Sequence, residues 1–232
     1  YFPHTNLLSI IEILKTRTLD HTPILYLPKI CLSTGRINFS DIEILKKAID
    51  LFLIVEDDHT FGLEGLTGFS KKSDTLLIDV LITHIPKNFG KMLTIISAQS
   101  DLLDRFMQYS FSINCLFPPA AYLGMFSAMI TLLESMKSQR DHIRQAANKL
   151  AQAFPDHCKI YNPLIVFTFG SEEEKLSFYK SLVDNGFLLP WSTSQEKHTL
   201  TFFLNHQLEE TCIHFIKKAL EAFPSQVICE TL

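Results

Sequence analysis

Residues 51–59 read LFLIVEDDH, an apolar run that changes at Glu56 to three acids and a histidine. A short apolar run bounded by polar residues predicts a strand, here over residues 51–55, that is buried on both faces as in parallel sheets. Further strands are predicted at residues 24–27, 76–82 and 92–97, and helices at residues 6–16 and 40–50. Strands that alternate with helices predict an α/β fold with a mostly parallel sheet.

The second half of the chain has a different organisation. After Pro118-Pro119, apolar residues keep helical spacing to about Phe154, which predicts one long helix, either straight or bent. Beyond it, the pattern predicts a compact α/β unit with strands at residues 164–169, near 187 and at 200–204, and helices at 172–183 and 208–222. We therefore predict two domains, residues 1–135 and residues 136–232, with the boundary inside the long helix.

Composition excludes several classes of protein. The 21 Lys and Arg stand against 25 Asp and Glu and form no stripe, so we expect no nucleic-acid partner. The five cysteines are widely spaced without a CxxC pair, which is typical of the reducing cytosol rather than of a disulfide-bonded or zinc-binding protein. The apolar stretches are too short to span a bilayer. These features predict a cytoplasmic protein without a membrane partner.

The densest polar cluster, residues 56–59, comes directly after the predicted strand at 51–55. Ligand sites of open α/β sheets lie at such carboxyl ends of strands. An acidic cluster there is either a solvated turn or a site for a divalent ion, although no second cluster of carboxylates or histidines provides the remaining ligands. The glycines that follow, between residues 60 and 68, are spaced by three and do not match the dinucleotide-binding GxGxxG pattern.

Lys87 holds an equivalent position after the next predicted strand and is followed by Asn88-Phe89-Gly90. A lysine at such a place is either an ordinary surface amine or a desolvated amine that forms a Schiff base with a carbonyl compound. The residue type alone leaves both possibilities open.

The order and spacing of these motifs resemble those of the α-oxoamine synthase family, a fold-type I group of pyridoxal-phosphate-dependent enzymes. The matching segments are residues 54–68, Asp79 with Lys87 eight residues later, residues 87–90 and Pro118-Pro119. Residues 1–14 and 33–37 also resemble segments of the family. The resemblance implies a large domain that binds pyridoxal 5'-phosphate (PLP), followed by a small C-terminal α/β domain.

The resemblance implies a role for each matched residue. Lys87 corresponds to the lysine that holds PLP as a Schiff base, and Glu56 to the acid that faces the ring nitrogen. His59 corresponds to the histidine that bonds the ring oxygen. A protonated ring nitrogen makes PLP an electron sink, and a neutral lysine attacks carbonyl groups. The remaining implied cofactor contacts come from Ser33 near the ring oxygen, from Thr83 and His84 at the phosphate, and from Cys115 of a partner subunit.

The implied activity is that of an acyltransferase that condenses an amino acid, L-alanine by resemblance, with a pimeloyl-type thioester and releases carbon dioxide, as in biotin biosynthesis. A homodimer is also implied. Glu56 replaces the family's Asp, while His84, Cys115 and Thr201 replace two threonines and an arginine, which leaves open a non-catalytic subunit that dimerises with an active partner. Because family members carry about a further domain before the point matched by Tyr1, we expect that part to be missing here, on another chain or lost.

Overall fold

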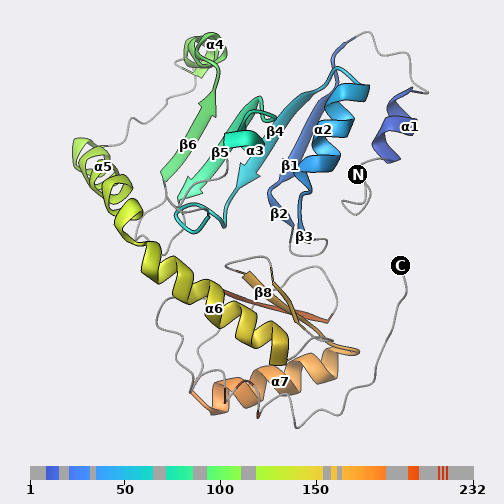
Figure 1. Ribbon diagram of the computed structural model, residues 1–232, viewed down its shortest axis with the longest axis vertical. Coiled ribbons are helices and arrows are strands. Elements are labelled where there is room, and N and C mark those ends of the chain that lie inside the picture. Colours follow the sequence, from blue (N-terminus) through green and yellow to red (C-terminus); the bar gives the residue numbers. More distant parts are fainter. Residues whose placement is uncertain are drawn as a thin grey trace. The chain divides into compact units, whose positions relative to one another are not determined.

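The computed structural model describes residues 9–15, 21–31, 35–64, 72–85, 93–110, 119–153, 158–160, 164–186 and 198–203, with His214, Ile216 and Lys218. The chain divides into two compact units, Tyr1–Lys137 and Ser138–Leu232 (Figure 1). The division follows Lys137, close to the boundary predicted after residue 135. Among the described residues, no helix combines the length and the apolar character needed to cross a membrane.

The first unit is built on a four-stranded sheet with the order β1-β4-β5-β6 (Figure 1). Its strands are β1 (Ile24–Pro28), β4 (Phe52–Asp57), β5 (Val80–Ile85) and β6 (Leu93–Ala98). The first three are parallel, and β6 runs antiparallel to β5. The predicted α/β class with a mainly parallel sheet is thus confirmed. Because parallel strands end at the same edge, the carboxyl ends of β1, β4 and β5 lie side by side.

Five helices and a short hairpin complete the described part of this unit: α1 (Ser9–Lys15), β2 (Ile30–Cys31), β3 (Gly35–Arg36), α2 (Phe39–Ala48), α3 (Lys72–Thr75), α4 (Ser100–Ser110) and α5 (Ala120–Ser135). α2 begins after Asn38, whose side chain accepts a hydrogen bond from the backbone N–H of Ser40 at 3.1 Å. The helix predicted from residue 40 therefore starts one residue earlier. Its buried Ile42 and Leu45 share a core cluster with Leu53 of β4.

β5 begins at Val80, four residues after the predicted start at Leu76. The cause is Asp79, whose carboxylate accepts hydrogen bonds from the backbone N–H of Leu53 at 2.7 Å and from Lys46 at 2.6 Å. These bonds fix Asp79 at the entrance of the strand and leave Leu76 in a turn, where it is exposed. The helix α4 was not predicted from the sequence.

A second core cluster of the first unit anchors the loop that follows β4. It contains Phe61 from that loop, Ile85 at the end of β5 and Leu133 from α5. Phe61 also stacks against Phe126 of α5, with 6.2 Å between the ring centroids. The loop that follows β4 is therefore anchored to the core through the side chain of Phe61.

The second unit contains α6 (Lys137–Ala153), apart from its first residue, and the antiparallel sheet of β7 (Cys158–Ile160), β8 (Leu164–Thr168) and β9 (Thr199–Phe203) with α7 (Glu172–Asp184). The rings of Phe167 and Phe169 pack against Phe178 of α7, with 5.7 and 5.2 Å between the ring centroids. The stretch predicted as one long helix, straight or bent, contains α5 and α6, which a turn at Met136 separates. The strand predicted near residue 187 lies outside the described residues.

Candidate active site

β4 carries two acids to opposite faces of the sheet. The strand continues through Glu56 and Asp57, two residues beyond its predicted end, and the N–H of Lys29 bonds to the carbonyl of Glu56 at 2.7 Å. Since side chains alternate along a strand, Asp57 shares the buried face with Leu53 and Val55, whereas Glu56 lies on the half-buried face. The cluster predicted at residues 56–59 therefore divides into two groups with different surroundings.

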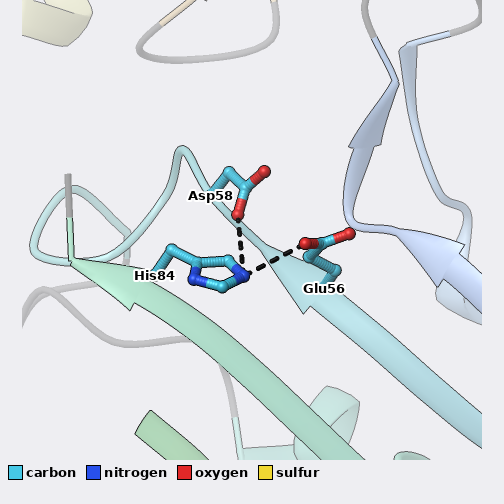
Figure 2. A group of neighbouring side chains, drawn as sticks. All are labelled: Glu56, Asp58 and His84. Carbon is cyan, nitrogen blue, oxygen red and sulfur yellow. Dashed lines mark hydrogen bonds and ion pairs between the residues drawn. The ribbon is translucent and has the colours of Figure 1, made fainter. Parts of the chain in front are cut away.

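On the half-buried face, Glu56 lies beside Asp58 and His84 (Figure 2). His84 Nε2 is 3.1 Å from Glu56 Oε1 and 3.6 Å from Asp58 Oδ1. The second oxygen of Glu56, Oε2, accepts a hydrogen bond from the hydroxyl of Tyr26 on β1. Both oxygens of Glu56 are thus held, one from each neighbouring strand.

The strand register explains why His84 reaches Glu56. Glu56 is paired with Ile82 across the parallel ladder, and His84 is two residues farther along β5, on the same face. On its other side His84 is paired with Thr94 of β6, and its Nδ1 lies 2.8 Å from the Thr94 hydroxyl. Thr83, which is buried, points to the opposite face, so the adjacent residues 83 and 84 do not act at one place.

The electrostatics of this group follow from burial and from its negative charge. Burial, and then the hydrogen bond to Glu56 and the charge of that residue, raise the pKa of Tyr26 to about 12. Burial and the charge of Glu56 also raise the pKa of Asp58, against the opposing effect of His84. Tyr26 therefore remains a protonated donor to Glu56 at neutral pH.

His59 lies on the loop directly after Asp58 and is half-buried. Its backbone N–H donates to Asp57 Oδ1 at 3.3 Å. Burial lowers the pKa of its imidazole, although the acids at positions 56–58 act in the opposite direction. His59 is therefore a neutral imidazole at pH 7, with one nitrogen that can donate and one that can accept a hydrogen bond.

On the buried face, Lys29 joins the end of β1 to the loop after β4. Its ammonium is 3.0 Å from Asp57 Oδ2 and 2.7 Å from Thr60 Oγ1, and it also bonds Glu64, which in turn pairs with Arg36. The exposed fraction is only 1% for Lys29, 4% for Asp57 and 8% for Glu64. The two ends of the loop, Asp57 and Glu64, are thereby fixed to one buried cation.

This network lowers the pKa of Asp57. Burial alone raises it, but the charge of Lys29 and the hydrogen bonds from Thr60 outweigh that effect and hold the pKa below the usual value of 3.8. Sequence analysis missed Lys29, Arg36 and Glu64. The available signal was a lysine inside the apolar run of residues 24–32, since a lysine is rarely buried without an acidic partner.

Of the other predicted site residues, Lys87, Ser33 and Cys115 lie outside the described residues. Glu56, Asp58 and His84 each offer one donor atom, and these atoms lie within 4.8 Å of one another. Two carboxylates and an imidazole are donors that can hold Mn²⁺ or Zn²⁺. This group differs from the metal site considered for residues 56–59. Asp57 is not part of it, because its side chain lies on the opposite face of the sheet and binds Lys29. In the structure the imidazole of His84 pairs with both carboxylates.

The chain is similar to known proteins at the level of structure. No family profile and no curated protein sequence matches the chain. Serine palmitoyltransferase from Sphingomonas wittichii matches with a TM-score of 0.73 and 14% identity, over 94% of this chain and 59% of that one. A structure of serine palmitoyltransferase (SPT) with PLP matches with a TM-score of 0.75 and 13% identity, over 93% of this chain and 59% of that one. The 8-amino-7-oxononanoate synthase of Francisella tularensis matches with a TM-score of 0.70 and 16% identity, over 95% of this chain and 68% of that one.

The chain spans 59% of the length of these serine palmitoyltransferases. Both kinds of neighbour are α-oxoamine synthases, the family that the sequence motifs resemble. The resemblance predicted from the motifs is therefore confirmed for the fold: nearly the whole chain has the fold of serine palmitoyltransferase and 8-amino-7-oxononanoate synthase.

Proposed function

We propose that this chain is part of a PLP-dependent acyltransferase of the α-oxoamine synthase type, which condenses an amino acid with an acyl thioester and releases carbon dioxide. One observation carries the proposal. In a fold shared with two such enzymes, the carboxylate of Glu56 and the neutral imidazole of His59 lie at the carboxyl end of β4, beside parallel strands β1 and β5.

The described residues fit the chemistry of the cofactor. A carboxylate has about four lone-pair positions, and Tyr26 and His84 use two of those on Glu56, so the acid can still accept a bond from a protonated ring nitrogen. His59 can donate to a ring oxygen through the one N–H that its imidazole carries in the neutral form. When bound, PLP supplies an electron sink for the carbanion formed at the amino acid.

Lys87 is the residue that we propose to bind the aldehyde of PLP. In the sequence it comes two residues after Ile85, the last residue of β5, and hence close in the chain to His84. A lysine amine becomes a nucleophile when it is neutral, and proximity to other cations or desolvation favours that form. After the cofactor is bound, the same amine would be the base or acid that moves a proton at the α-carbon of the amino acid.

Absorbance tests this proposal. The purified protein, mixed with PLP, should develop a visible band that borohydride abolishes. Lys87→Ala should lose the band, whereas Lys91→Ala, which removes a lysine four positions away, should keep it. An identical band in the wild-type protein and in Lys87→Ala would contradict the role of Lys87.

For the substrates, we propose L-alanine and a pimeloyl-type thioester, as used by an 8-amino-7-oxononanoate synthase in biotin biosynthesis, and a homodimer in which the segment around Cys115 completes the site. The neighbouring serine palmitoyltransferases make serine with a palmitoyl thioester the competing pair. Release of free thiol, measured with each amino acid and each thioester in all four combinations, distinguishes the two pairs. Release that requires serine and a palmitoyl thioester would overturn this choice.

A second candidate function is that of a non-catalytic subunit. The replaced positions favour it, because Glu56 stands where the family has an aspartate, and His84, Cys115 and Thr201 stand where it has two threonines and an arginine. In that case Lys87→Ala would leave the phenotype of the organism unchanged, whereas loss of function in that variant would exclude it.

A further inference from the structure

We propose that His84 is a positioning residue that holds the carboxylate of Glu56 toward the ring nitrogen of the cofactor. This inference rests on the proposed function, in which Glu56 is the partner of that nitrogen. It assigns to His84 a different task from the phosphate contact that the sequence predicted at residues 83–84.

The imidazole of His84 is fixed by its two ring nitrogens. Nδ1 lies 2.8 Å from the Thr94 hydroxyl, and Nε2 lies 3.1 Å from Glu56 Oε1. A carboxylate only accepts hydrogen bonds, so Nε2 must carry the hydrogen. In the neutral imidazole Nδ1 is then the acceptor, and Thr94 donates to it. A hydroxyl can donate or accept, so the side chain of Thr94 is compatible with the ring form that donates to Glu56.

The acid is held from two sides. Tyr26 on β1 donates to Oε2. His84 on β5 donates to Oε1 (Figure 2). A glutamate side chain has three rotatable bonds, and ordering them costs conformational entropy. Bonds that order Glu56 before the ligand arrives remove this cost from binding.

Asp58 shows why the tether matters. Its Oδ1 lies 3.6 Å from His84 Nε2, so two carboxylates of like charge meet at the same ring nitrogen. The pKa of Asp58 is raised by burial and by Glu56 and lowered by His84. Without the imidazole, the charge of Asp58 would repel Glu56, and Tyr26 alone would hold the acid. His84 therefore acts on the orientation of Glu56 and not on the aldehyde or the phosphate of the ligand.

Two variants distinguish the roles of the two ring nitrogens of His84. In His84→Gln, the amide nitrogen takes a place similar to Nε2 and can still donate to Glu56. In His84→Asn, the shorter amide can replace only Nδ1 and loses the bond to Glu56. The two variants carry the same chemical group and remove the same ring, so a difference between them reports on the contact with Glu56.

Two ligands then distinguish the contribution of the ring nitrogen to binding from that of the rest of the cofactor. PLP and its 1-deaza analogue, in which carbon replaces the ring nitrogen, share the aldehyde and the phosphate. We expect His84→Asn to weaken PLP binding about tenfold, the effect of losing a hydrogen bond to a charged group at a partly exposed site. The same variant should bind the deaza analogue as the wild-type protein does, and His84→Gln should bind PLP with nearly wild-type affinity.

Each outcome has a distinct meaning. Equal loss of affinity for both ligands in His84→Asn would overturn the inference, because the defect would not involve the ring nitrogen. Unchanged PLP affinity in His84→Asn would overturn it as well. If the wild-type protein binds neither ligand, the proposed function itself fails. Far-ultraviolet circular dichroism of both variants confirms that the fold is retained in each comparison.

Discussion

Replacement of Lys29 by Met should destabilise the first unit strongly. The ammonium of Lys29 is 3.0 Å from Asp57 and 2.7 Å from Thr60, bonds Glu64 as well, and is 1% exposed. Removing one member of a buried ion pair costs about 3–5 kcal/mol, since the remaining charge stays buried without its partner. Met fills a similar volume, so a cavity contributes little.

The structure favours the lower end of that range. Asp57 keeps its bonds from the hydroxyl and the N–H of Thr60, at 2.6 and 2.8 Å, and Glu64 keeps Arg36. We therefore expect a loss of about 3 kcal/mol in the free energy of unfolding, measured by urea titration with circular dichroism. The control is Lys47→Met, which removes an exposed pair with Glu43 and should cost less than about 0.5 kcal/mol.

The charge itself can be tested separately from the shape. When Asp57→Asn and Glu64→Gln are added to Lys29→Met, the buried charges disappear together, and the triple variant should regain most of the lost stability. A loss of less than about 1 kcal/mol in Lys29→Met, close to that of the Lys47→Met control, would refute the role of the buried network.

Three further results are expected. Asp57 has a pKa below its usual 3.8, so its contribution to stability is present above that pH and is lost as the pH falls through the lowered pKa. Stability should therefore fall less steeply with acid in Asp57→Asn than in the wild-type protein, as measured by circular dichroism. An equal slope would contradict the shift. Tyr26 should titrate near pH 12 in the wild-type protein and closer to 10 in Glu56→Gln, because the raised pKa depends partly on that acid. Nuclear magnetic resonance of labelled tyrosine measures this pKa. An unchanged pKa in the variant would contradict the contact between Tyr26 and Glu56. Phe178→Ala should cost about 3–5 kcal/mol in the second unit, since the ring is fully buried against Phe167, and a loss below about 1 kcal/mol would show that this core is loosely packed.

The sequence predicted the sheet because its strands are short apolar runs. The strand at residues 164–169 and the helix at 172–183 match β8 and α7 closely, since period and capping signals agree there. Strand ends were harder to predict, because they depend on contacts between distant residues. Asp79 delays β5 through bonds to Leu53 and Lys46, and the pairing of Lys29 with Glu56 extends β4.

The candidate site shows the same limit. The acids at residues 56–58 were visible as a polar cluster, but their division between two faces follows from the strand continuing to Asp57. His84 meets Glu56 because β5 lies next to β4 in a particular register, which composition does not encode. Lys29 was overlooked because a lysine is normally exposed, and only its partners reveal why it is buried.

The mass of the peptide that contains Lys87 tests the central claim most directly. The purified protein is incubated with PLP, reduced with borohydride and digested, and the modified lysines are located by mass spectrometry. The proposed function predicts one pyridoxyl group, on Lys87, at a yield that follows the saturation of PLP binding. An unmodified Lys87, or modification spread over exposed lysines such as Lys47 to the same extent, would contradict it.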